Sequence, residues 1–224
     1  MPIRIVTDST CDLPARLAQL HGISVLPMLI KVGERCYFDG IDITRQDFYE
    51  HLDEYDPYPI TASAPVETFR QVYEELAAQG ATEILSIHIA SSLSKVLDAA
   101  QQAANETRAA KVTVFDSRQV SLGIGFLAES AANAANQGRS MAEILDLLEK
   151  QVECTYVVAL LDLLEYMQRS GRMSAVMTGL GKMLKFKPLI RIHNGMPTAE
   201  SVRTHEKATS RLLQVLEEYG PLER

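Results

Sequence analysis

Polar side chains that could hold an anion follow three predicted strands, at the point where each strand ends. These polar runs are Asp8-Ser9-Thr10 after IRIVT, Ser91-Ser92-Leu93-Ser94 after EILSIHIA, and Asp116-Ser117 after KVTVF. Because the carboxyl ends of parallel strands line the ligand crevice of an open α/β sheet, we expect the three runs to form one small polar site.

The run that contains Ser91, Ser92 and Ser94 also lies at the start of a predicted helix. Its hydroxyl groups and free backbone N–H groups would point at an anion together, with the positive end of the helix dipole behind them. A carboxylate or a phosphate would fit there. N-capping by Ser91 or Ser92 and tight turns at Asp8 and Asp116 explain each run taken singly. The coincidence of three such runs favours a binding site.

Other catalytic or metal-binding patterns are weak. The sequence contains none of the motifs GxxxxGK[ST], GxGxxG and GxSxG, so it offers neither a nucleotide phosphate loop nor a hydrolase elbow. His88 could serve a serine hydrolase, but a side chain in the middle of a strand is more often packed than placed as a general base. Asp39 and Asp42 in DGID could form a metal pair, yet we favour a turn, which uses the same residue types. We expect no catalytic residue, no metal and no cofactor.

Composition narrows the class of protein. With 29 acidic and 22 basic side chains the formal net charge is -7, which argues against a nucleic-acid binder. No run approaches the roughly 18 apolar residues of a membrane span, and the N-terminus lacks the apolar region of a signal peptide. We therefore expect a cytoplasmic protein without a membrane span. Cys11, Cys36 and Cys154 are widely spaced and are expected to be free thiols.

The elements that must position the polar runs alternate between strands and helices in the first part of the chain. Strands are predicted at residues 3–7, 23–32, 83–89 and 111–116, and helices at 14–21, 44–52, 65–78, 93–108 and 121–136. Pro27 would put the second strand at an edge or a bulge. This order predicts a parallel sheet with helices on its faces.

The organisation changes after a further helix at residues 140–152. A strand at 155–161, short helices at 162–168 and 174–184, two strand-like runs around Asn194-Gly195, and an amphipathic helix at 205–219 follow. Asn-Gly between such runs is the strongest short signal for a hairpin. We therefore predict two domains, a parallel α/β domain at 1–152 with the polar site and a smaller mixed α+β domain at 153–224.

Methionines gather in the second predicted domain. Residues 167–183 contain four of the eight methionines, and the run 174–184 carries one charged residue, Lys182. An ordinary buried helix explains this run by itself, although Met beside Gly and Ala also suits a wall around a flexible apolar guest. Together with an anion-sized polar site, the run suggests a ligand with an acidic head and a long apolar tail, such as a fatty acid.

The chain resembles the DegV family of bacterial fatty-acid-binding proteins, whose kinase-associated members are called FakB. The matching pieces span nearly the whole chain in the family's order: IVTDSTCDLP, YFDGIDI, TASAPVETF, SIHIASSLS, VFDSRQVSLGIG, SGRMS and KFKPLIRIHNG. The resemblance implies a two-domain protein with a Rossmann-like first domain and one long-chain fatty acid bound between the domains. It further implies a fatty acid kinase as partner, which phosphorylates the presented carboxylate.

Residue by residue, the resemblance implies a carboxylate site and an acyl site. Thr61 matches the family's threonine near the carboxylate, Ser91 and Ser94 match the serines of its SSxLSGT motif, and Arg172 matches the arginine of its GGRIS motif. We add Ser9 and Ser92 from the polar runs to the expected carboxylate site. Met177 and Met183 are the residues expected along the acyl tail.

Family members continue past the last predicted helix with further strands, whereas this sequence stops at Arg224. We therefore expect the second domain to be short at its C-terminal end, with a sheet edge that pairs with another chain or leaves the domain more mobile than the first. Two alternatives to fatty-acid binding stay open. One is a hydrolase or acyl transferase that uses Ser94 or Ser91 with His88, and the other is a degenerate family member that acts as an interaction protein.

Overall fold

The centre of the molecule is a parallel four-stranded sheet. The computed structural model describes residues 2–161, 165–172 and 187–220. The strands of the central sheet lie in the order β2 (Ser24–Leu26), β1 (Ile3–Asp8), β6 (Glu83–His88) and β7 (Lys111–Asp116). Neighbouring strands all pair in parallel, and Glu83 lies between Ile3 and Lys111. The parallel sheet predicted from the sequence is confirmed.

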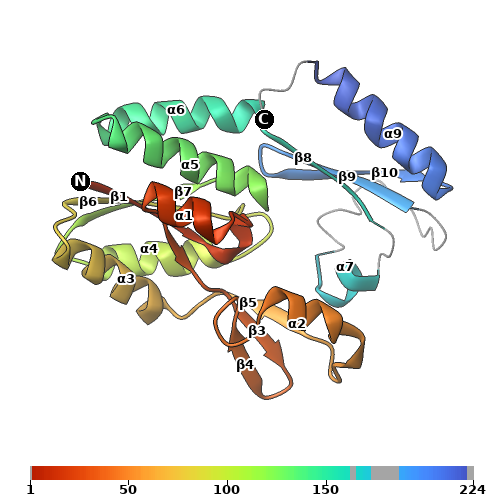
Figure 1. Ribbon diagram of the computed structural model, residues 1–224, viewed down its shortest axis with the longest axis horizontal. Helices are drawn as coiled ribbons and strands as arrows, with labels where there is room; N and C mark the ends of the chain where they lie inside the picture. Colours follow the sequence, from red (N-terminus) through yellow and green to blue (C-terminus); the bar gives the residue numbers. More distant parts are fainter. Residues whose placement is uncertain (1, 162–164, 173–186, 221–224) are drawn as a thin grey trace.

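Helices cover both faces of the central sheet and make three layers (Figure 1). One face carries α3 (Val66–Ala78) and α4 (Val96–Glu106), and the other carries α1 (Ala15–His21) and α5 (Leu122–Asn136), with α6 (Met141–Cys154) packed on α5. Because both faces are covered, most residues of the two middle strands, β1 and β6, are buried. Side chains alternate along β1, so Ile5 and Asp8 enter opposite halves of the core.

The prediction of one strand at residues 23–32 is wrong. The chain forms β2 in the central sheet, turns at Pro27 and Met28, and then forms β3 in a separate antiparallel sheet. That sheet has the order β4 (Arg35–Phe38), β3 (Leu29–Val32) and β5 (Ile60–Ala62), and the helix α2 (Arg45–Glu50) lies between β4 and β5 in sequence. Proline has no N–H to continue a ladder, which is why the strand breaks there. Thr61 on β5 lies opposite Ile30.

A third sheet follows α6 and is antiparallel throughout. Its order is β10 (Met196–Val202), β9 (Lys187–His193) and β8 (Tyr156–Leu160), and α9 (His205–Glu218) packs against it. The predicted hairpin is confirmed: Asn194 and Gly195 have φ values of 48° and 76°, the positive pair that a two-residue type I′ turn requires. The short helix α7 (Glu165–Arg169) places the guanidinium of Arg169 4.7 Å from the ring centre of Tyr58.

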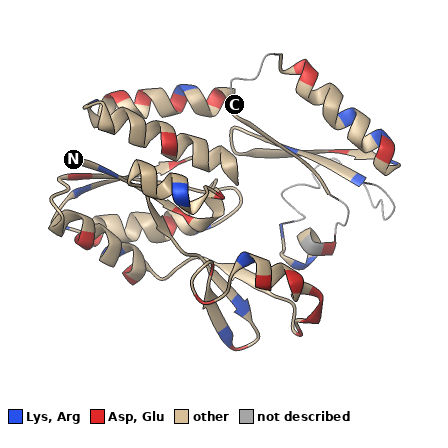
Figure 2. Ribbon diagram, viewed as in Figure 1, with Lys and Arg blue, Asp and Glu red and all other residues tan. Residues whose placement is uncertain are grey.

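The described residues also bear on the thiols, the charges and the helix lengths. Cys11, Cys36 and Cys154 are free thiols, as predicted. Figure 2 shows Lys and Arg dispersed over many elements instead of concentrated on one. Within the described part of the chain, no helix is long and apolar enough to cross a membrane, and no three His, Cys, Asp or Glu residues are grouped to hold a metal ion.

Candidate functional site

Asp8 ends β1 at the middle of the central sheet. The chain leaves β1 towards β2 on one side and leaves β6 towards β7 on the other, so the carboxyl ends of β1 and β6 form the crevice where open α/β sheets bind ligands. We call the turns at residues 9–11, 89–94 and 116–118 the strand-end site. The buried Asp8 carboxylate accepts hydrogen bonds through one oxygen from the Thr10 N–H, at 3.0 Å, and from the Thr10 hydroxyl. Asp8 thus forms the tight turn that would by itself explain this polar run.

A chain of buried hydrogen bonds continues from Asp8 through β6 to α3. The other Asp8 oxygen lies 2.8 Å from His88 Nδ1, His88 Nε2 lies 2.7 Å from Ser86 Oγ, and that oxygen lies 2.8 Å from the Tyr73 hydroxyl. All four side chains are 0% exposed, and Phe69 packs edge-on against the imidazole. Both ring nitrogens of His88 therefore contact protein groups, which agrees with the prediction of a packed histidine.

Burial and hydrogen bonding act in opposite directions on the pKa of Asp8. Burial in the core raises this pKa, but the hydrogen bond and electrostatic attraction of His88, together with the hydrogen bonds from Thr10, outweigh burial and hold the pKa below its ordinary value. At the other end of the chain, burial raises the pKa of Tyr73 to about 12. At neutral pH these hydrogen bonds therefore connect the ionised carboxylate of Asp8 to the neutral phenol of Tyr73.

Asp116 holds the next turn of the strand-end site. Its carboxylate accepts hydrogen bonds from the Ser91 hydroxyl at 2.6 Å, from the Ser91 N–H at 3.3 Å and from the Arg118 N–H at 2.8 Å. Asp116 thus forms the turn that would by itself explain this polar run. The hydroxyl of Ser91 therefore donates its proton to Asp116. That Ser91 binds the ligand directly stays a prediction.

The prediction that a helix begins near residue 93 is wrong. Helix α4 begins at Val96, and the N–H groups of Leu93 and Ser94 both donate to the carbonyl of Ala90, at 2.9 and 3.2 Å. Residues 91–94 form a turn, since serine favours turns over helix interiors. The backbone N–H groups of Leu93 and Ser94 are consequently not free for an anion, and the serine hydroxyls carry whatever binding this turn provides.

Ser92 contacts the third sheet. Its hydroxyl donates to the carbonyl of Gly195 at 2.6 Å, and the Gly195 N–H donates to the carbonyl of Arg118 at 2.8 Å. Gly195 has φ of 76°, and a Cβ there would lie 3.4 Å from the Arg118 side chain. The hairpin of the third sheet is thus held against two turns of the strand-end site.

Three further hydroxyls were predicted to bind the carboxylate, and only one of them forms a hydrogen bond with another described residue. The buried Ser9 hydroxyl accepts a hydrogen bond from the Met28 N–H at 3.1 Å. Thr61 is exposed and Ser94 is half-buried, and neither hydroxyl has a hydrogen-bond partner among the described residues. Those two side chains are available to a ligand, whereas Ser9 already holds the start of the second sheet.

Arg172 is the predicted cation of the site. It is half-buried, donates to the carbonyl of Ser170 at 2.8 Å, and forms no ion pair with an acidic residue in the described ranges. A half-buried guanidinium without a carboxylate is suited to an anionic ligand. Met177 and Met183, the predicted acyl residues, lie outside the described residues.

Arg45 is a residue of the site that sequence reasoning missed. From α2 it pairs with Asp12, lies 3.2 Å from Asp39, and donates to the Ser9 carbonyl at 2.5 Å. Although partial burial lowers the pKa of Arg45, its acidic partners raise the pKa above the ordinary value. Arg45 joins α2 to the turn that follows β1. Its partners lie up to 36 residues away in sequence, so no local pattern indicated it.

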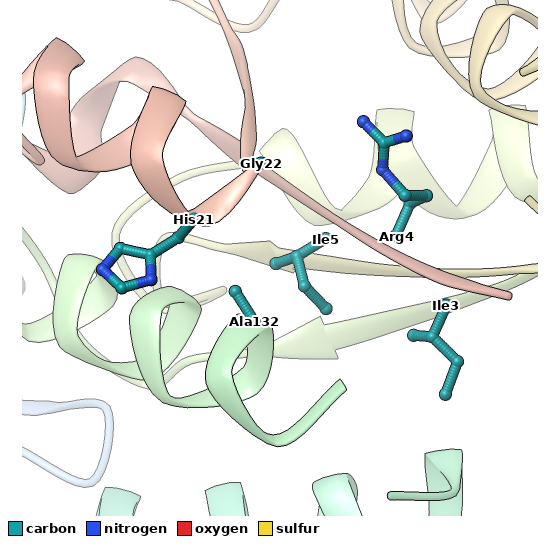
Figure 3. Close-up of a pocket in the computed structure, with 6 residues that line it drawn as sticks. All are labelled: Ile3, Arg4, Ile5, His21, Gly22 and Ala132. Atoms are coloured by element: carbon teal, nitrogen blue, oxygen red, sulfur yellow. The ribbon is translucent and has the colours of Figure 1, made fainter. Parts of the chain in front are cut away.

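A hollow of about 250 Å³ lies away from the strand-end site (Figure 3). Ile3, Ile5, Gly22 and Ala132 line it together with His21 and Arg4. It lies near the amino end of β1, and Figure 3 shows Arg4 directed away from His21. The hollow therefore lacks the convergent polar groups of the strand-end site.

The fold and the site together define an open α/β protein with a polar site at the switch point of its sheet and an antiparallel sheet attached beside that site. The chain belongs to the DegV family: residues 2–223 match the family described as "Uncharacterised protein, DegV family". The sequence-based assignment to this family is confirmed.

Two curated relatives illustrate the similarity. A DegV domain-containing protein of Streptomyces coelicolor is 35% identical over 215 residues, which cover 95% of this chain and 75% of the relative. Protein DegV of Bacillus subtilis is 31% identical over 220 residues, which cover 97% of this chain and 78% of the relative.

Solved structures share the fold over almost the whole chain. DegV of Bacillus subtilis, described as a fatty acid binding protein, has a TM-score of 0.88 at 31% identity, with 97% of this chain and 78% of that chain covered. A DegV family protein of Thermus thermophilus, reported for its fatty acid binding, has a TM-score of 0.87 at 31% identity, with 98% and 78% covered. A stearic acid-binding protein of Eubacterium ventriosum has a TM-score of 0.88 at 26% identity, with 97% and 76% covered.

Proposed function

We propose that this protein binds a long-chain fatty acid, with the carboxylate at the strand-end site and the acyl tail buried between residues 1–152 and 153–224. The observation that carries this proposal is the match, at a TM-score of 0.88 and over 97% of the chain, to the fatty-acid-binding DegV of Bacillus subtilis. The available polar groups agree with a carboxylate, since hydroxyls and a guanidinium all donate to carboxylate oxygens.

The residues predicted to bind the ligand fall into two groups, according to whether their polar atoms already form hydrogen bonds with other parts of the protein. Thr61, Ser94 and Arg172 contact the carboxylate, because their polar atoms are not used by other described side chains. Ser9, Ser91 and Ser92 hold the surrounding turns through their bonds to Met28, Asp116 and Gly195. Met177 and Met183 line the tail.

The protein acts in the cytoplasm as a carrier and presents the fatty acid to a separate fatty acid kinase. The absence of a nucleotide motif in the sequence supports this division of labour, since the kinase supplies the ATP chemistry. Association of two chains through the third sheet belongs to the same proposal.

The alternative of a serine hydrolase is disfavoured by the surroundings of His88. A general base needs a nitrogen within hydrogen-bond reach of the nucleophilic hydroxyl, in a place that a substrate can enter. The two nitrogens of His88 contact Asp8 and Ser86, and all three side chains are fully buried. The hydroxyls of Ser91 and Ser94 therefore have no basic partner in His88.

Extraction of the purified protein followed by mass spectrometry tests the proposal. We expect a long-chain fatty acid at one equivalent per chain, and rebinding of palmitic acid after delipidation. A purified protein that holds no fatty acid and does not rebind palmitic acid after delipidation would contradict fatty-acid binding. Turnover of an acyl ester by the delipidated protein would instead support the hydrolase.

A further inference from the structure

The buried chain Asp8–His88–Ser86–Tyr73 does not touch a ligand, since all four side chains are 0% exposed. Its members come from β1 and β6, which end at the strand-end site, and from α3, which follows the segment that carries Thr61. We propose that Asp8 and His88 are a positioning pair, which holds the turns of the site in the arrangement that distinguishes a carboxylic acid from an uncharged head group on the same tail. The inference rests on the proposed function.

The Asp8 carboxylate joins two of these turns directly. One oxygen holds Thr10 in the turn after β1, and the other accepts from His88 and, at 3.4 Å, from the N–H of Ile89. Because an ionised carboxylate only accepts hydrogen bonds, Nδ1 of His88 must be the donor. Ile89 begins the turn that carries Ser94. A single buried carboxylate therefore fixes the turn after β1 relative to the turn after β6.

The other end of the chain reaches the segment that carries Thr61. His88 connects through Ser86 to Tyr73 on α3, and Phe69 of the same helix packs on the imidazole. Helix α3 has Pro65 as its N-cap, a few residues after Thr61 on β5. These hydrogen bonds thus connect β1 and β6 to α3, the helix that follows the segment with Thr61.

This arrangement predicts an effect on ligand preference. Ligand-binding groups keep their geometry only when packing and hydrogen bonds behind them lock it. Several hydrogen bonds to a carboxylate require donors in fixed positions, whereas the burial of a hydrocarbon tail is not directional. Loosening the two turns should therefore weaken recognition of the carboxylate and leave the contribution of the tail unchanged.

The test compares palmitic acid with 1-hexadecanol, which has the same tail length, on the delipidated full chain, with affinities of both measured by calorimetry. For the wild type we expect the acid to bind more tightly than the alcohol. His88→Leu removes both nitrogens, and we expect it to reduce the acid-over-alcohol preference roughly tenfold, as for the loss of a charged hydrogen bond, with alcohol affinity retained. His88→Asn places an amide nitrogen near the position of Nδ1 and should keep most of the preference.

Thr107→Val is the matched control, because the Thr107 hydroxyl is also buried and donates to the Ala103 carbonyl at 2.9 Å. It ends α4, near the amino ends of the strands and away from the strand-end site. We expect this variant to bind the acid and the alcohol each with the wild-type affinity. If His88→Leu does not fold, Asp8→Asn and Ser86→Ala carry the same test, with the larger loss of preference expected for Asp8→Asn.

The outcomes separate this inference from the proposed function. A wild type that binds neither probe overturns fatty-acid binding itself. A wild type that prefers the acid, combined with folded variants at His88, Asp8 and Ser86 that prefer it equally, overturns only the positioning pair. A parallel loss of acid and alcohol affinity in these variants also overturns it, because a merely structural role predicts that pattern.

Discussion

The hydroxyl of Ser92 donates a 2.6 Å hydrogen bond to the carbonyl of Gly195, which lies 103 residues further along the chain. Gly195 in turn donates to the carbonyl of Arg118, and Arg118 donates to Asp116, which also holds Ser91. The turn that follows β6 and the hairpin of the third sheet are therefore parts of one hydrogen-bonded unit. A change in the strand-end site can therefore reach the third sheet, which belongs to the part of the chain proposed to bury the acyl tail.

Ser92→Ala should loosen this unit without removing a ligand contact. The Gly195 carbonyl loses its side-chain donor, which typically costs about 1 kcal/mol. We expect faster hydrogen exchange in β9 and β10 than in the wild type, while β1 and β6 are unchanged. Ser94→Ala is the control, because the Ser94 hydroxyl has no partner among the described residues. Equal exchange in both variants would contradict the role assigned to Ser92.

Ser94→Ala and Thr61→Val should each weaken fatty-acid binding. Each substitution removes one donor to a carboxylate, worth about 1.5 to 3 kcal/mol, so roughly tenfold losses or more are expected. Calorimetry with palmitic acid measures the change, and thermal unfolding shows whether the variants remain folded. Wild-type affinity in both folded variants would mean that the carboxylate lies elsewhere.

Gly125→Ala should destabilise the protein, although alanine is the better helix former. A Cβ at this position would lie 2.9 Å from the carbonyl oxygen of Cys11, so α5 or the turn after β1 must shift. Intrinsic propensity alone predicts a gain of up to about 1 kcal/mol. We expect instead a loss of roughly 1 to 3 kcal/mol in urea unfolding, as in other overpacked cores. A more stable variant would show that the turn adapts without cost.

The lowered pKa of Asp8 predicts how stability depends on pH. Because the folded-state pKa lies below the ordinary value of 3.8, ionised Asp8 stabilises the folded protein. This contribution is present above the unfolded-state pKa and is lost as pH falls through the folded-state pKa. The difference in unfolding free energy between wild type and Asp8→Asn should be largest at neutral pH and shrink in acid. A difference that is constant over this range would contradict the shift.

Several elements could be predicted because their causes are local. Asn194-Gly195 specifies a type I′ turn by its tolerance of positive φ, and Ser140 with Glu143 forms a capping box at the start of α6. The alternation of apolar strands and amphipathic helices predicted the parallel sheet, since each strand must be buried between helices. The strand ends at Asp8 and Asp116 followed from the same pattern, which is why the strand-end site could be located.

The partners of the polar side chains were decided only by the tertiary structure. His88 lies 80 residues from Asp8 and Ser92 lies 103 residues from Gly195, distances over which sequence patterns carry no information on pairing. The sequence determined which polar residues stand at the ends of the strands, because burial periodicity and turn chemistry are local. Folding decided which of them are bound to other protein groups and which are left for a ligand, because hydrogen bonding depends on what the packed sheet and helices bring within about 3 Å.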